Sequence, residues 1–225
     1  PFRGKECVRP RALLNTELPS VSKPLAAAAG MCLFALFAHS NSPLEVLAAM
    51  GLCLAALSLY TDLTAHHAPA VLLGLGRFSK RTPGFTAFGI VSGCALGLMY
   101  RWAYDLAPFP AVFGRFAPAA VLIGATEEVL YRGYIQGRMR RYGPLGAAAF
   151  ASLCHSAYKC ALFLLHNQPV DIDLWTLGTL TFACGLGLGM LRERSGSLLP
   201  SIAAHGMFDL IAYGEYARAP WWVWC

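Results

Sequence analysis

The stretch "FAPAAVLIGATEEVLYRGYIQGR", residues 116–138, is an apolar run of membrane-spanning length with two adjacent glutamates and an arginine inside it. An ionisable side chain at the centre of a membrane costs on the order of 2.5 to 3.5 kcal/mol, so such residues mark an internal site or a water-filled cavity. Glu128 and Arg132 lie four residues apart and are predicted to pair on one helical face. Glu127 points about 100° away, and we expect it to have no local partner.

The composition supports a membrane protein. Of the 225 residues, 56% are hydrophobic and 13% are charged, against about 25% charged in soluble domains, and the mean hydropathy is +0.50. The net charge of +6 fits basic residues that collect in cytoplasmic loops. No basic patch with interleaved aromatic residues occurs, so we expect the lipid bilayer, and no nucleic acid, as a partner.

The hydrophobic pattern predicts an all-α fold, a polytopic membrane bundle of about seven transmembrane helices. The predicted spans are 25–39, 44–63, 84–101, 116–138, 144–166, 174–191 and 197–214, and proline or glycine marks most of their boundaries. The piece 68–78 is too short to cross and is expected to be interfacial or re-entrant. We expect a basic cytoplasmic N-terminal segment, 1–24, followed by a single integral-membrane domain, 25–225.

The distribution of basic residues predicts that the N-terminus is cytoplasmic. That orientation places thirteen of the eighteen Lys and Arg residues on the inner side and three on the outer side. No cleaved signal peptide is expected, because a small-residue cleavage site is lacking after the basic start. The C-terminal Trp221, Trp222 and Trp224 have the composition of an interfacial aromatic belt.

Cysteines and glycines in the apolar segments have structural interpretations. The eight cysteines include no CxxC pair, and six of them are expected to be small core hydrophobes: Cys32, Cys53, Cys94, Cys154, Cys160 and Cys184. The spaced glycines are expected to allow close helix packing, namely Gly93 with Gly97, and the series Gly185, Gly187 and Gly189.

Two further predicted spans carry histidines at a depth similar to that of Glu127. At 1.5 Å per residue, Glu127 lies roughly 16 Å from the inner edge and His155 at the same height, while His205 lies roughly 12 Å from that edge. Asp209 shares a helical face with His205. Lys159 is interpreted as a snorkelling side chain outside the site. An ion pair or a linking histidine can also be purely structural, but three helices reaching one level favour a functional site.

The motifs at these positions resemble those of one family. "EEVLYR" is similar to the EExxxR motif of the CAAX prenyl endopeptidase and bacteriocin-processing (CPBP, or Abi) intramembrane proteases, and "ASLCH" and "HGMFD" are similar to its FxxxH and HxxxN/D motifs. The resemblance covers a protease-like core of about 84–214. The chain departs from the pattern at two positions: Ala151 stands where Phe is expected, and Asp209 stands where Asn is common.

The resemblance implies roles for the site residues. Glu127 would be the general base that activates water, with His155 helping to hold it, while His205 and Asp209 would stabilise the oxyanion. Glu128 and Arg132 would shape the site. An ionised Asp209 would repel an oxyanion, so it is either protonated or orients His205; we favour the second role because their spacing permits contact.

A metal site is an alternative interpretation. Glu127, His155 and His205 form a set like the His2Glu ligands of catalytic zinc. The sequence has no HExxH motif, and we expect no cofactor, with zinc left as the alternative.

The leading hypothesis is an intramembrane endopeptidase that processes membrane-anchored protein or peptide substrates. The resemblance implies prenylated C-termini, leader or bacteriocin peptides, or C-terminal sorting tags as substrates. A composition rich in Ala, Gly and Arg without eukaryotic trafficking signals favours a prokaryotic plasma (inner) membrane and a C-terminal sorting or processing protease. Two other functions remain open: a proton-coupled membrane transporter, since such residues also relay protons, and a non-proteolytic immunity or scaffold member of the same family.

Overall fold

The computed structural model describes residues 21–38, 43–76, 78–165 and 173–218, which form helices and loops without a strand. The helices are α1 (Ser22–Phe37), α2 (Glu45–Ala65), α3 (Pro69–Leu73), α4 (Thr82–Ala103), α5 (Ala117–Glu128), the π-helix η1 (Val129–Ile135), α6 (Gln136–Met139), the 3-10 helix η2 (Arg140–Tyr142), α7 (Pro144–Leu164), α8 (Leu174–Ser195) and α9 (Leu199–Tyr213). A helix therefore lies at each of the seven predicted spans, and α3 lies in the short piece 68–78. The N-terminal segment up to residue 20 and the tryptophan-rich tail lie outside the described residues.

Of the described helices, α2, α4, α7 and α8 are long and apolar enough to cross a membrane. The other three predicted spans are occupied by α1, by α9, which has 15 residues, and by the continuous helical run 117–139 that carries the two glutamates. Large apolar side chains on α2 and α4, such as Leu57 and Val91, are exposed, as expected for surfaces that face lipid rather than water. Seven crossings and a cytoplasmic N-terminus remain predictions.

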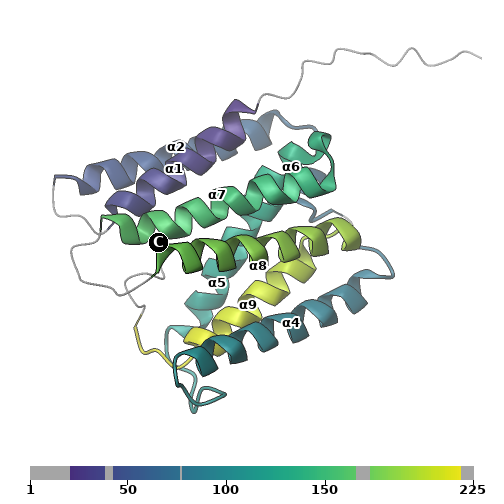
Figure 1. The fold of residues 1–225 in the computed structure, drawn as a ribbon. Coiled ribbons are helices and arrows are strands. Elements are labelled where there is room, and N and C mark those ends of the chain that lie inside the picture. Colours follow the sequence, from purple (N-terminus) through teal and green to yellow (C-terminus); the bar gives the residue numbers. More distant parts are fainter. Residues whose placement is uncertain (1–20, 39–42, 77, 166–172, 219–225) are drawn as a thin grey trace, which may run out of the picture.

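The helices stack so that α7 and α8 lie between the α1–α2 hairpin and the α9–α4 pair, with α5 beside α9 (Figure 1). The α1–α2 hairpin packs through α1 on α7, and α7 packs on α8. The helix α9 packs on α4 along one side and on α5 along another, while α4 and α8 make few contacts with each other. As a result, α5, η1, α7 and α9 meet in the middle of the molecule.

Glycines allow the closest of these contacts. A Cβ atom on Gly97 would lie 2.6 Å from Cβ of Ile211, and one on Gly93 would collide with the carbonyl oxygen of Ala204, so both glycines bring α4 against α9 as predicted. Gly185 similarly lets α8 approach Arg132, since a Cβ atom there would lie 2.6 Å from Nη2. Gly187 differs from the prediction, because a Cβ atom there meets nothing within 4 Å.

The cysteines differ partly from expectation. All six in the described helices are free thiols, but Cys53 and Cys184 are exposed, and the other four are only partly buried. The assignment of all six to the core is therefore wrong for these two. Their helices turn these faces outward, where an apolar thiol is compatible with lipid.

A buried arginine closes one end of the bundle, and we call its contacts the end clamp. The Arg101 side chain is 1% exposed and donates from Nε to the carbonyl oxygen of Ala107 and from Nη1 to that of Ile211, 3.3 Å away. Its Nη2 forms an ion pair with Oε2 of Glu215 at 3.0 Å. The end clamp thus ties the end of α4 to its following loop and to α9.

At the other end of the bundle, side chains that follow η1 hold the α5–α6 run in place. Gln136 donates from Nε2 to the carbonyl oxygen of Gly189, 3.0 Å away, and to Oε1 of Glu193, 2.9 Å away. Arg138 forms an ion pair with Asp62 of α2 at 2.5 Å. These contacts fix the rotation of α6 about its helix axis.

Candidate active site

The continuous α5–η1 run, α7 and α9 bring seven ionisable side chains together, and we call these seven residues the charge cluster. They are Glu127 and Glu128 at the end of α5, Arg132 in η1, His155 and Lys159 in α7, and His205 and Asp209 in α9. The π-helix begins directly after Glu128, and single π-helical turns within α-helices often occur at functional sites. All six residues predicted for the site lie in this cluster.

Glu127 has two charged or polar partners. The residue is 6% exposed, and its Oε2 lies 2.9 Å from Nε2 of His155 while its Oε1 lies 2.5 Å from Nζ of Lys159. Both partners belong to α7, so neither lies on the helix of Glu127 itself, and the contact with His155 agrees with the prediction. The prediction that Lys159 only snorkels outside the site is wrong. A signal was available, since Lys159 follows His155 by four residues and shares its helical face.

The protonation of His155 follows from its neighbours. Its Nδ1 lies 2.8 Å from Nη1 of Arg132, and because a guanidinium group can only donate, Nδ1 must be the acceptor. The proton of neutral His155 therefore resides on Nε2, which donates to Glu127. Tyr131 stacks on the imidazole with ring centroids 4.5 Å apart, which further fixes the plane of the ring.

Glu128 connects an arginine and the second histidine. Its Oε1 lies 3.1 Å from Nη1 of Arg132, as the spacing predicts, and 2.9 Å from Nδ1 of His205. The residue is fully buried. Since the carboxylate beside an arginine accepts hydrogen bonds, Nδ1 of His205 is the donor. The contact with His205 was not predicted, because sequence spacing relates residues only within one helix.

The free edge of His205 faces two carboxylates at a greater distance. Its Nε2 lies 3.8 Å from Oε2 of Glu127 and 3.8 Å from Oδ2 of Asp209. Both distances exceed a hydrogen bond, so neither carboxylate is hydrogen-bonded to this nitrogen. The residue that contacts and orients His205 is therefore Glu128, and the contact predicted between His205 and Asp209 is a longer one.

The arrangement does not fit the alternative zinc site. Among the described residues, no group of three His, Cys, Asp or Glu side chains is arranged to hold a metal ion. Both ring nitrogens of His155 are engaged, one by Arg132 and one by Glu127, whereas a zinc ligand must present a free lone pair. Lys159 places a cation directly beside Glu127, where it would repel a metal ion. We derive no step through a metal.

Comparison with known families identifies one match. Residues 109–211 match the family described as type II CAAX prenyl endopeptidase Rce1-like. The match runs from the loop before α5 into α9 and includes all seven residues of the charge cluster, while the predicted protease-like core, 84–214, begins earlier. No curated protein and no solved structure matches the chain significantly.

Proposed function

We propose that this protein is an intramembrane endopeptidase, since residues 109–211 match the type II CAAX prenyl endopeptidase Rce1-like family. Its reaction is the hydrolysis of a peptide bond in a membrane-anchored protein or peptide. The observation that carries the proposal is the junction of three helices at one carboxylate: Glu127 lies 2.9 Å from His155 and 3.8 Å from His205.

Glu127 is the proposed general base. A carboxylate has about four acceptor positions, of which His155 and Lys159 occupy two, so a water molecule can still donate to it. Glu127 takes one proton from this water as its oxygen attacks the carbonyl carbon of the substrate. The Nε2–H group of His155 and the ammonium of Lys159 hold the carboxylate in position.

His205 is the proposed donor to the oxyanion. The charge cluster holds three carboxyl groups against the cations of Arg132 and Lys159, so a protonated His205 would balance three ionised carboxylates. With Nδ1–H bound to Glu128, the Nε2–H of the imidazolium points to the space beside Glu127. A donor placed there stabilises the oxygen that becomes negative in the tetrahedral intermediate.

Collapse of the intermediate completes the reaction. The carbon–nitrogen bond breaks, and Glu127 returns the proton that it took from water to the leaving amine, so the products are a carboxylic acid and an amine. Asp209 lies beside the same edge of His205. We assign to it the electrostatic stabilisation of the imidazolium at 3.8 Å, while Glu128 fixes the orientation of the ring.

The proposed substrate class is a membrane protein or peptide that is processed near a C-terminal sorting or anchoring segment, in a prokaryotic plasma membrane. The buried position of Glu127 and His155 supports a substrate that enters from the membrane rather than from solution.

The test compares the termini of membrane proteins, by mass spectrometry, in cells with the wild-type protein and in cells with the Glu127→Ala or His205→Ala variant. We expect new termini that require both residues, and purified variants that fail to cleave the substrate so identified. Glu45→Gln, at an exposed position of α2, is the matched control. Wild-type cleavage by Glu127→Ala protein would refute the proposal.

A further inference from the structure

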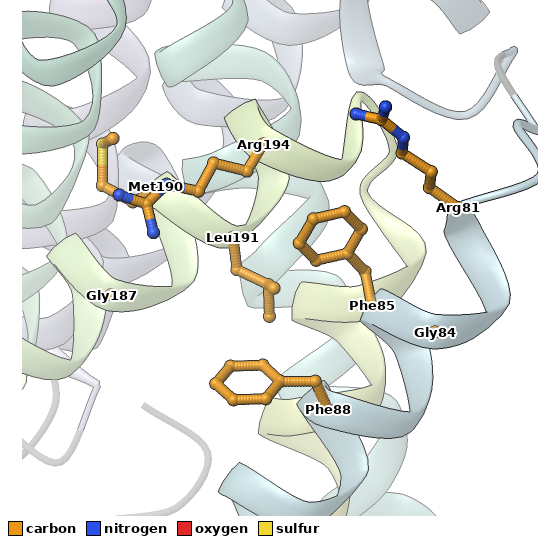
Figure 2. A pocket seen from close by; sticks show the side chains of 8 residues that line it. All are labelled: Arg81, Gly84, Phe85, Phe88, Gly187, Met190, Leu191 and Arg194. Atoms are coloured by element: carbon orange, nitrogen blue, oxygen red, sulfur yellow. The ribbon is translucent and has the colours of Figure 1, made fainter.

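A second feature of the molecule is an open groove between α4 and α8, with a volume of about 660 Å³. Two helical stripes line it: Arg81, Gly84, Phe85 and Phe88 at the start of α4, and Gly187, Met190, Leu191 and Arg194 at the end of α8 (Figure 2). Small-molecule sites have volumes of about 300–1,000 Å³. None of the charge-cluster residues lines the groove, so it is separate from the proposed active site.

The groove exists because its two walls pack on other helices. The helix α4 packs closely on α9 because Gly93 and Gly97 have no side chain between the two helices. The helix α8 packs on α7. A Cβ atom added to Gly84 or to Gly187 meets nothing within 4 Å, so no described side chain closes the space between these two stripes. The groove therefore lies open on the outer surface of two helices that are long and apolar enough to span a membrane.

The two ends of the groove differ in polarity. Phe85, Phe88 and Leu191 lie between the helices (Figure 2). Both arginines start from the same end, but the Arg194 side chain extends along α8 toward Met190, away from Arg81. Neither Arg81 nor Arg194 forms an ion pair with a described residue. The nearest acid along α8, Glu193, is already paired with Arg192 and Arg140, each at 2.9 Å. Within the described part of the chain, two exposed guanidinium groups thus remain without an anion.

We propose that this groove binds one anionic phospholipid. Its phosphate lies at Arg81, the exposed side chain of Arg194 turns toward the same phosphate when the lipid binds, and one acyl chain lies along Phe85, Phe88 and Leu191. Basic pockets between membrane-spanning helices hold anionic headgroups in this way, and guanidinium groups bind phosphate oxygens through paired hydrogen bonds. The distribution of Lys and Arg predicts that this end of α4 and α8 is cytoplasmic, which places the phosphate in the inner leaflet.

The test measures lipid retained by the purified full-length protein in detergent, using native mass spectrometry with phosphatidylglycerol or phosphatidylcholine added. We expect the wild type to retain one phosphatidylglycerol in preference to phosphatidylcholine. The double variant Arg81→Gln/Arg194→Gln should weaken this binding by about 30-fold, since each basic residue near an anionic lipid surface contributes roughly a factor of five or more. Arg141→Gln, at an exposed arginine near the same end with the aromatic neighbour Tyr142, is the control for charge.

A second variant tests the apolar part of the groove. Gly187→Leu places a side chain in the groove at a position where an added Cβ atom meets nothing within 4 Å. We expect it to abolish the retention of phosphatidylglycerol while the melting temperature without lipid stays unchanged. Gly146→Leu is the control, since its Cβ would meet only Cβ of Tyr142 at 3.7 Å. Excess inorganic phosphate should not displace the lipid, because the acyl chain supplies part of the binding.

Three results would overturn the proposal. The first is equal retention of the two lipids, and the second is retention of phosphatidylglycerol that the double variant and Gly187→Leu leave intact. The third is a Gly187→Leu protein that binds phosphatidylglycerol normally but requires more substrate for half-maximal cleavage, which would show that the groove holds the substrate anchor. Lipid retention is independent of proteolysis, so its failure leaves the proposed peptidase function untouched.

Discussion

The end clamp and the charge cluster are two ways of burying an arginine in the same bundle. Arg101 and Arg132 are each 1% exposed. Arg101 donates mostly to backbone carbonyl oxygens and reaches a partly exposed glutamate. Arg132 contacts only side chains in its described interactions, a carboxylate and an imidazole, and its Nε has no hydrogen-bond partner among the described protein atoms.

The difference separates a structural role from a chemical one. Carbonyl oxygens neither gain nor lose protons near neutral pH. The backbone contacts of Arg101 therefore do not change with protonation, and their role is to join chain segments. The partners of Arg132 are linked through His155 and Glu128 to groups that exchange protons, and the contacts of the arginine select the tautomer of His155. We therefore expect substitutions in the charge cluster to affect activity and substitutions in the end clamp to affect stability.

The largest effect is expected from Glu127→Gln, which keeps the size of the side chain and removes the base. The rate of cleavage should fall by about 10²–10⁴-fold, the usual contribution of a general base, with little change in the melting temperature. Cleavage of a reporter substrate by the purified protein measures the first, and thermal unfolding in detergent measures the second. A Glu127→Gln protein that unfolds as well as losing activity would contradict the proposed difference between the charge cluster, which serves activity, and the end clamp, which serves stability.

Arg101→Met is expected to produce the opposite pattern. It leaves the carbonyl oxygens of Ala107 and Ile211 without their donor and Glu215 without its ion pair, and such losses cost about 2–4 kcal/mol. Unfolding in detergent should occur at a lower temperature, while the rate of cleavage well below that temperature should stay within about twofold of wild type. Arg218→Met, at an exposed position near the same end, is the control. A Michaelis constant or a maximal rate that changes in the folded variant would contradict the structural role.

Glu128→Gln sharpens the comparison within the charge cluster. The amide still accepts a hydrogen bond but no longer carries the negative charge shared by Arg132 and His205. Groups that orient a catalytic side chain typically contribute about 10–100-fold, so we expect the maximal rate to fall by that amount with an unchanged Michaelis constant. Activity that equals that of the wild type would assign Glu128 to the structure alone.

The smallest effect is expected from Lys159→Met. It removes the ammonium that contacts Oε1 of Glu127 and leaves the cluster with an excess of negative charge, but His155 still holds the carboxylate. Cleavage should slow by roughly two- to fivefold, equivalent to about 1 kcal/mol or less, because the Lys159 side chain is still 23% exposed to solvent and His155 remains in place. Lys159→Arg should restore most of the rate, since it keeps a positive donor. Failure of that rescue would mean that Lys159 acts through packing.

Much of this organisation follows from sequence patterns. Apolar runs and their proline and glycine boundaries predicted the positions of seven helices, because a segment that is buried in lipid must be apolar along its whole length. Depth along the helices predicted that Glu127, His155 and His205 meet. Spacing of four residues also predicted the contact between Glu128 and Arg132.

Contacts between helices could not be predicted in the same way. The hydrogen bond from His205 to Glu128 depends on the rotation of α9 about its axis, which Gly124 and Asp209 set by their close approach. The π-helix in η1 also has no sequence pattern that distinguishes it from an α-helix. Lys159 was missed for a different reason: its long side chain fits either the membrane interface or a buried anion, and only the position of Glu127 decides between them.

The π-helix in η1 also sets how the two ends of its helical run are rotated relative to each other. Upstream of it, Glu127 faces His155, and downstream, Gln136 and Arg138 face partners in α8 and α2. If these same seven residues, Val129–Ile135, closed as a regular α-helix without the wider π turn, everything after them would rotate by about 100°. Either Glu127 or the pair Gln136 and Arg138 would then lose its partners. The π-helix η1 therefore allows one helical run to place the proposed catalytic carboxylate and the downstream anchoring side chains toward their partners at the same time.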